Sequence, residues 1–357
     1  MCNRLRIPLL FYISLLIWQN ARAQSPETRE HLIQRSFEQL QSGQFDDGLA
    51  TCAKLRRNWP DDPAGYLLAA NIYQTMMRDY RVRLFEAKFD SLIKSAVQLA
   101  DKQVSKHATP EMLFMLGTSR GYRGLHRFRC GEWGAGFRDA VLSLHAMERA
   151  LRMDPGFVDP GLGLALYEYW KSAKLDFGLG MLKHKRTAAI AALEDIRRRG
   201  RYLAIDATYA LQTIRVHEKD YAAALEINSW LYERFPQNIS TLYHRGLILE
   251  KLDRPAEALA AWDTLVQRLH DFSPVSDGFL AECHLHRAQL NERLKQLVST
   301  APENEHVLVA LQSAHTHAQQ RRAAVELEGP LASFDDINKA IKQMVKKYAT
   351  AGEILDN

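Results

Sequence analysis

The chain has 357 residues, of which 46% are hydrophobic and 25% are charged, and its formal net charge is +5. With only 19 glycines and 12 prolines, this composition excludes collagen-like and intrinsically disordered proteins. A single compact core would be unusually large at this length. We therefore expect either two domains or one elongated stack whose core grows with the chain.

The first 23 residues have the pattern of a secretory signal peptide. Two arginines precede an apolar run from Ile7 to Trp18, and the small residues at 21–23 offer a cleavage site before Gln24. The apolar run is shorter than a membrane-spanning helix, and Cys2 precedes it, whereas a lipoprotein carries its acylated cysteine at the end of the run. We therefore predict export to the periplasm or cell envelope, without a lipid anchor or a transmembrane segment in the mature chain.

Export would leave an almost neutral protein. Residues 1–23 hold three arginines and no acid, so the remaining chain has 44 basic and 42 acidic side chains. Nucleic acid is therefore not an expected partner. The three remaining cysteines, Cys52, Cys130 and Cys283, are too widely spaced for a disulfide framework or a CxxC zinc site, although one disulfide is compatible with export. Their disulfide state stays open.

Beyond residue 23 the pattern is helical throughout. Apolar residues recur at i, i+3, i+4 and i+7, and alternating strand patterns are absent, so we predict an all-α protein. Proline is tolerated in the first turn of a helix, and Ser or Thr caps its start. These signals place helix starts at Asp62-Pro63, Thr109-Pro110, Asp159-Pro160, Pro255, Pro302 and the capping box from Ser333 to Asp336.

The predicted helices repeat with a period of 34 residues. The segment 221–238 precedes the similar segment 255–272 by this distance, which places Ala224 over Ala258. Small residues are needed where two helices touch closely, and Gly246 in the intervening helix also satisfies this requirement. A helix-turn-helix unit of 34 residues cannot bury its apolar face alone, so successive units must stack into one continuous core.

These features resemble the tetratricopeptide-repeat superfamily, and within it a group of exported bacterial repeat proteins without an assigned activity. The closer resemblance runs from about Phe85 to Leu265, on the segments FEAKFDSLIKSAVQLADK, GYRGLHRF, YEYWKS, GRYLAIDATYAL and DYAAALE. It implies a right-handed superhelical solenoid of degenerate helical hairpins that binds a protein or peptide on its concave side. It implies no chemistry.

We divide the chain on this basis. Residues 1–23 are the signal peptide, 24–272 the solenoid, and 273–357 a further hairpin of two polar-faced helices and a C-terminal capping helix. Two departures from the period stand out: a long helix over about 81–102, and an insertion near 173–184 with several apolar residues. The insertion is either a lid on the core or a binding element.

In such a superhelix the first helices of successive units line the inner wall. The predicted partner-binding residues are Tyr209, Thr213, Tyr243 and Leu247, beginning at Asp206, with Tyr122 and Arg123 continuing the wall toward the N-terminus. Tyrosine is favoured at interfaces because it offers contact area at a small cost in conformational entropy. The alternative is that both wall tyrosines, Tyr209 and Tyr243, pack against neighbouring helices.

Arg123 also belongs to a stripe formed with Arg120 and Arg127. Their spacing would suit the recognition of a carboxylate, but an exposed face paired with acids on a neighbouring helix is the favoured interpretation.

Two chemical alternatives remain. Cys130 lies near His126, Arg127 and Arg129, whose positive charge could activate a thiolate, although no acidic partner can be assigned. A metal site could use one histidine from each of two pairs, His284 with His286 and His315 with His317.

We predict no catalytic, cofactor or metal site. The expected function is a non-catalytic protein-binding or peptide-binding scaffold of the bacterial cell envelope, with unknown partner and oligomeric state. The alternatives are a Cys/His-dependent enzyme or metal-binding protein, and a peripheral envelope protein that contacts a membrane through 173–184.

Overall fold

The computed structural model describes residues 27–175, 182–297, 304–330 and 332–350. The predicted signal peptide, including Cys2, lies outside these residues. The described helices are α2 (Arg29–Gln41), α3 (Phe45–Asn58), α4 (Ala64–Asp79), α5 (Glu86–Lys106), α6 (Pro110–Arg129), α7 (Trp133–Met153), α8 (Gly161–Leu175), α9 (Lys183–Arg199), α10 (Ala204–His217), α11 (Tyr221–Arg234), α12 (Ile239–Lys251), α13 (Pro255–His270), α14 (Asp277–Leu297), α15 (Glu305–Gln320) and α16 (Phe334–Thr350).

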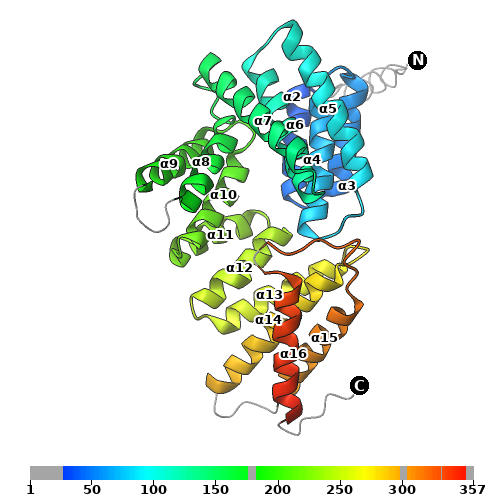
Figure 1. The fold of residues 1–357 in the computed structure, drawn as a ribbon, viewed down its shortest axis with the longest axis vertical. Coiled ribbons are helices and arrows are strands. Elements are labelled where there is room, and N and C mark those ends of the chain that lie inside the picture. Colours follow the sequence, from blue (N-terminus) through cyan, green and yellow to red (C-terminus); the bar gives the residue numbers. More distant parts are fainter. Residues whose placement is uncertain (1–26, 176–181, 298–303, 331, 351–357) are drawn as a thin grey trace, which may run out of the picture.

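The helices form an all-α stack, as predicted. Each described helix packs against the next one along the chain, and α4 also packs against both α2 and α6 (Figure 1). This is the contact pattern of a solenoid of helical hairpins, in which a unit buries its apolar face only against its neighbours. The described residues contain no β-strand, only an isolated bridge between Val82 and Glu326.

The helix starts follow the sequence signals. The hydroxyl of Thr109 accepts a hydrogen bond from the backbone N–H of Met112 at the start of α6, and Pro110 occupies the first turn. Ser333 caps α16 in the same way through the N–H of Asp336. Such caps satisfy backbone donors that have no partner within the helix. Pro302 lies outside the described residues, and α15 begins at Glu305.

The repeat frame is confirmed at its tightest contact. A Cβ atom added to Gly246 on α12 would lie 2.7 Å from Cε2 of Trp262 on α13, so only glycine fits there without movement. Trp262 is fully buried, as are Ala224 and Ala258. Gly246, one of the small residues of the repeat frame, is therefore a place where two helices approach each other closely.

The expected helix over 81–102 begins later than predicted. Residues 80–85 form a loop, and α5 runs from Glu86 to Lys106. Arg81 has a φ of 53°, in the left-handed region that ends a helical path. The loop is held by the segment after α15: Leu327 N–H donates to Arg81 O and Arg83 N–H donates to Val325 O, each at 2.9 Å.

These loop contacts link the N-terminal part of the stack to its C-terminal part. The segment that follows α15 lies against the lower end of the α2–α7 block (Figure 1). The rings of Tyr80 and Phe272 stack with centroids 3.9 Å apart, and the side-chain amide of Asn238 donates to Gln41 O at 3.1 Å. The N-terminal hairpins therefore touch both α12 and the C-terminal helices, although these regions are far apart in sequence.

The C-terminal helices differ in part from the prediction. α15 and α16 each present one apolar face, and Ile337 and Ile341 of α16 are buried against α14 and α15. α14 was expected to have a polar face, but its first half is buried on all sides, including Glu282 and His284. The segment after α15 covers the side that would otherwise face solvent, which explains the difference.

The insertion predicted near 173–184 is described only at its ends. Residues 173–175 complete α8 and residues 183–184 begin α9, while 176–181 lie outside the described residues. None of the described helices is both long and apolar enough to cross a membrane.

Candidate binding hollow

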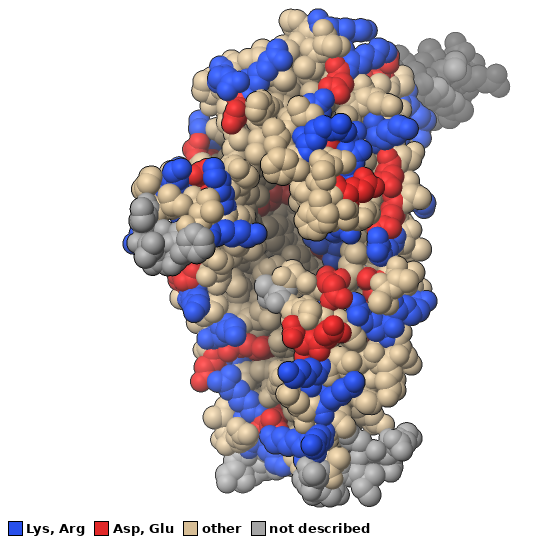
Figure 2. Space-filling view, viewed as in Figure 1, with Lys and Arg blue, Asp and Glu red and all other residues tan. Residues whose placement is uncertain are grey.

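The structure has a hollow between the α8–α9 hairpin and the α2–α7 block (Figure 2). Two of the predicted wall residues, Tyr122 on α6 and Asp206 on α10, lie close enough for the charge of Asp206 to act on the Tyr122 hydroxyl. Burial raises the pKa of the Tyr122 hydroxyl, the Asp206 carboxylate raises it further, and Arg78 opposes both effects. Polar groups from α4, α6 and α10 therefore act on one another electrostatically, while the assignment of these residues to a partner-binding wall stays a prediction.

Arg78 stands at the centre of this arrangement. It lies in the last turn of α4, where its Nε donates a hydrogen bond to Asp79 Oδ1 at 2.7 Å. The Arg78 side chain is 62% exposed, whereas that of Asp79 is 5% exposed. The charge of Arg78 acts on groups from α6, α10 and α12, including Tyr209 and His244. Arg78 therefore projects between four helices, a role that nothing in its local sequence indicated.

Asp206 carries a carboxylate in an unusual state. Its Oδ2 atom is buried and has no hydrogen-bond partner among the described residues. Burial raises the pKa of Asp206 to about 6, the charge of Arg78 opposes this shift, and Asp159 adds to it. Buried carboxylate oxygens normally accept at least one hydrogen bond, so this atom lacks the donor that it would be expected to have.

Tyr209 and Thr213 lie one turn apart on α10. The hydroxyls of Tyr209 and Thr241 are hydrogen-bonded at 2.7 Å, and the half-buried ring of Tyr209 faces the charges of Asp79 and Arg78. Thr213 is exposed and donates to the backbone O of Tyr209 at 3.0 Å. We take Arg78, Tyr122, Asp206, Tyr209, Thr213 and His244 as the candidate wall of the hollow between the α8–α9 hairpin and the α2–α7 block, and we call it the central hollow.

Tyr243 does not line the hollow, contrary to the prediction. It is 4% exposed, its hydroxyl donates to Glu282 Oε1 at 2.8 Å, and its ring packs edge-on against Trp262 and Phe279. Leu247, one turn later, is half-buried against the same apolar cluster. The alternative interpretation, core packing, holds for both residues.

On α12 the wall position belongs instead to His244. Its Nδ1–H donates to Ser240 O at 2.8 Å, and burial lowers its pKa. A shift of one residue turns a helix by about 100°. The predicted wall position on α12 was therefore wrong by one residue. The helix face that carries Tyr243 is covered by α14.

Arg123 is not available to a partner either. Its Nε and Nη2 bind both oxygens of Asp139 on α7, at 2.7 and 2.6 Å, and Arg127 Nη1 binds the same carboxylate at 2.6 Å. Arg120 binds Asp101 on α5. The favoured interpretation of the arginine stripe, pairing with acids on neighbouring helices, is confirmed.

The histidines between 284 and 317 do not converge on a metal position. His286 contacts Glu250, and His317 Nδ1 lies 2.9 Å from Asp277 Oδ1. His284 Nδ1 accepts a hydrogen bond from Arg287, and burial lowers the pKa of His284 to about 3. Within the described residues these side chains form no group of three potential ligands.

Cys130 lies exposed at the end of α6, and none of Cys52, Cys130 and Cys283 forms a disulfide. Burial and the nearby carboxylate of Glu86 raise the pKa of Cys130, and this outweighs the opposing charge of Arg83. The local field therefore favours the thiol over the thiolate, which is unfavourable for a nucleophile.

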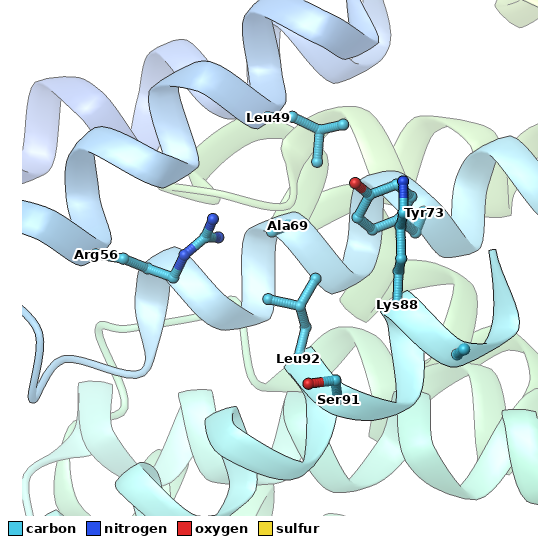
Figure 3. Close-up of a pocket in the computed structure, with 8 residues that line it drawn as sticks. Leu49, Arg56, Ala69, Tyr73, Lys88, Ser91 and Leu92 are labelled. Atoms are coloured by element: carbon cyan, nitrogen blue, oxygen red, sulfur yellow. The ribbon is translucent and has the colours of Figure 1, made fainter.

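A further depression lies between α3, α4 and α5. It has a volume of about 390 Å³, and Leu49, Ala69 and Leu92 form its apolar floor (Figure 3). Arg56 and Lys88 stand on opposite sides. Arg56 donates to Gly65 O at 3.0 Å, and the Lys88 ammonium lies 5.4 Å from the centroid of the Tyr73 ring. Both cations are engaged, so the depression offers fewer free polar groups than the central hollow.

Comparison with known proteins finds similar folds at low identity. No protein-family model matches the chain, and no curated protein matches it. The C-terminal part of a TPR repeat-containing protein from Cytophaga hutchinsonii has a TM-score of 0.40 and 13% identity, covering 82% of this chain and 97% of that one. A thermophilic TPR protein from Thermus thermophilus has a TM-score of 0.36 and 17% identity, covering 62% and 98%.

A tetratricopeptide repeat protein from Parabacteroides merdae has a TM-score of 0.35 and 13% identity, covering 88% of this chain and 98% of that one. The consecutive helical hairpins of this chain form an all-α solenoid.

Proposed function

We propose that the protein is a non-catalytic scaffold that binds an extended polypeptide segment in the central hollow. One observation carries the proposal: α4, α6 and α10 all hold buried polar atoms that have no hydrogen-bond partner among the described residues. Besides Asp206 Oδ2 they include Gln74 Oε1, one turn before Arg78 on α4, and Thr118 Oγ1, one turn before Tyr122 on α6. Residues four apart share a helix face. Buried polar groups are nearly always paired, so several unpaired ones favour an absent partner rich in donors and acceptors, such as a peptide backbone.

We expect the bound segment to carry an acidic group. Arg78 uses its Nε for Asp79 and presents the rest of its guanidinium to the hollow. Arg129, at the end of α6, is exposed and forms no ion pair with a described residue. Burial lowers its pKa first, and the charge of Arg78 lowers it further. Two neighbouring guanidinium groups that repel each other favour a carboxylate between them.

The experiment is to pan a random-sequence peptide library against the chain and against a variant with a filled hollow. Thr213→Trp places a large ring on the exposed wall of α10 without removing a buried contact. Thr264→Trp on α13 is the matched control, because its hydroxyl bonds the carbonyl four residues earlier in the same way. We expect enriched peptides with acidic residues to bind the wild type and the control at least tenfold more tightly than Thr213→Trp. Equal binding to all three chains would reject the hollow as the site.

The cellular location is a separate proposal, supported by the signal-peptide pattern of residues 1–23. We propose that the protein acts in the periplasm or cell envelope. N-terminal sequencing of the chain recovered from the envelope fraction should begin at Gln24, and recovery from the cytoplasm with Met1 retained would contradict export.

A further inference from the structure

Three potential metal ligands meet where the start of α5 packs against the end of α6, and a fourth, Asp90, lies close to one of them. Glu86 and Asp90 lie one turn apart on α5, and His126 and Cys130 lie one turn apart at the end of α6. Ligand atoms of Glu86, His126 and Cys130 all lie within 4.8 Å of one another. His126 Nε2 is also 3.2 Å from Asp90 Oδ1. Two helices thus contribute one pair of ligands each, at the i, i+4 spacing that places both members on one face.

Two distances from His126 Nε2, to Cys130 Sγ and to Asp90 Oδ1, match the ligand–ligand distances of a tetrahedral zinc site. Cys130 Sγ lies 3.5 Å from His126 Nε2. With Zn–S near 2.3 Å and Zn–N or Zn–O near 2.1 Å, a tetrahedron has sulfur–nitrogen edges of about 3.5 Å and nitrogen–oxygen edges of about 3.4 Å. The two measured distances that involve His126 are therefore close to those that a single Zn²⁺ would impose.

Hydrogen bonding within the cluster does not account for the arrangement as well. The thiol of Cys130 and the carboxylate of Asp90 both approach the same ring nitrogen of His126. A single N–H at this nitrogen can point well at only one of the two groups, so hydrogen bonding leaves the other contact weak. A catalytic Cys-His-acid relay needs the acid on the opposite nitrogen, and this geometry does not provide one.

We propose that Glu86, His126 and Cys130 hold a Zn²⁺ ion that ties α5 to α6, and that the exposed Asp90 carboxylate turns toward the ion as the fourth ligand. Arg83 Nε donates to Glu86 Oε1 at 2.8 Å, which orients that carboxylate and leaves its other oxygen for the metal. With a thiolate, three anionic ligands exceed the charge of Zn²⁺ by one, and Arg83 neutralises the excess. Arg129 also acts on the cluster and weakens its attraction for a cation, so affinity depends on the Cys130 thiolate.

The pKa shifts of Cys130 and His126 in the metal-free chain are consistent with the assignment of these residues as zinc ligands. Burial and Glu86 raise the pKa of Cys130, and burial lowers the pKa of His126. The neutral imidazole is the form that binds a metal, and a bound cation removes the penalty on the thiolate. The site was not found from the sequence because the pairs lie about forty residues apart, and α5 and α6 bring them together.

The experiment adds Zn²⁺ and, as a spectroscopic probe, Co²⁺ to the tag-free chain. We expect one equivalent to bind, with a thiolate-to-cobalt charge-transfer band in the near ultraviolet. Cys130→Ser should abolish this band. Asp90→Asn should weaken Zn²⁺ binding at least tenfold, and it should not disturb folding because the Asp90 side chain is 61% exposed. Asp101→Asn, an exposed acid farther along α5, is the matched control and should bind Zn²⁺ as the wild type does.

Protection from alkylation gives an independent measurement. Zn²⁺ should shield Cys130 from iodoacetamide, and peptide mapping identifies the cysteine that reacts. The proposal is overturned if the wild type does not bind one equivalent of Zn²⁺, or if Cys130→Ser and Asp90→Asn bind it as the wild type does. It does not depend on the peptide-binding hollow, so failure of either proposal leaves the other intact.

Discussion

Arg81 and Glu282 form a buried ion pair between residues that lie 201 positions apart in the chain. Both side chains are about 5% exposed or less, and the Arg81 guanidinium lies 3.7 Å from the centroid of the Phe279 ring. Glu282 also accepts the hydroxyl of Tyr243. The pair therefore joins the α4–α5 loop to α14 and α12, and it holds the two ends of the stack together.

The first prediction concerns this closure. Glu282→Gln keeps an acceptor for Tyr243 but leaves the charge of Arg81 buried without a counterion. Breaking a buried pair in this way costs about 3 to 5 kcal/mol. Chemical denaturation should show this decrease in the free energy of unfolding. Glu257→Gln, which breaks the exposed pair with Arg254, should cost about 1 kcal/mol or less. Equal losses in the two variants would show that the closure contributes little.

The second prediction concerns the repeat frame. Gly246→Ala forces a Cβ atom against the fully buried Trp262, whose Nε1 also donates to Glu250 at 2.5 Å. Overpacking costs about 1 to 3 kcal/mol, and it outweighs the gain of about 1 kcal/mol in helix propensity. We expect a lower melting temperature for Gly246→Ala.

Gly163→Ala on α8 is the matched control for this variant. An added Cβ meets nothing within 4 Å at Gly163, so the variant should be neutral or slightly more stable. If both glycine variants have the same melting temperature, the close approach of α12 and α13 is not a determinant of stability.

The fold was more predictable from the sequence than the site. The period of 34 and the small residues at 224, 246 and 258 depend on local packing between adjacent helices, which a sequence pattern records directly. The wall assignment stays a prediction for Tyr122, Asp206 and Tyr209, on all of which the charge of Arg78 acts. It failed for Tyr243 because its burial is caused by Glu282, a residue 39 positions away on a helix outside the recognised repeats. Arg78 was missed because only the assembled stack gives it neighbours from four helices.

The third prediction is a loss of stability in acid through His284. Its pKa is lowered to about 3 in the folded chain, first by burial and then by the charge of Arg287, from an ordinary value of 6.5. Between these pH values the unfolded chain binds a proton that the folded chain does not, so the free energy of unfolding falls as the pH falls. From pH 7 to pH 5 this group should cost about 2 kcal/mol.

His284→Gln should remove this contribution while still accepting the hydrogen bond from Arg287. Denaturation at a series of pH values measures the slope, and His107→Gln, which changes an exposed histidine, is the control. A slope in His284→Gln as steep as that of the wild type would mean that other groups cause the acid sensitivity.

The last prediction concerns the carboxylate in the central hollow and has the opposite sign. The pKa of Asp206 is raised to about 6 by burial, from an ordinary value of 3.8. Between these values the folded chain holds a proton that the unfolded chain has lost, so the contribution of Asp206 to stability falls as the pH rises, and the penalty persists above pH 6. Asp206→Asn should therefore stabilise the chain by about 1 to 3 kcal/mol at pH 7 and by little at pH 3.5. Denaturation at both pH values checks this, and an Asp206→Asn variant less stable than the wild type at pH 7 would show that the charged carboxylate is held by favourable contacts.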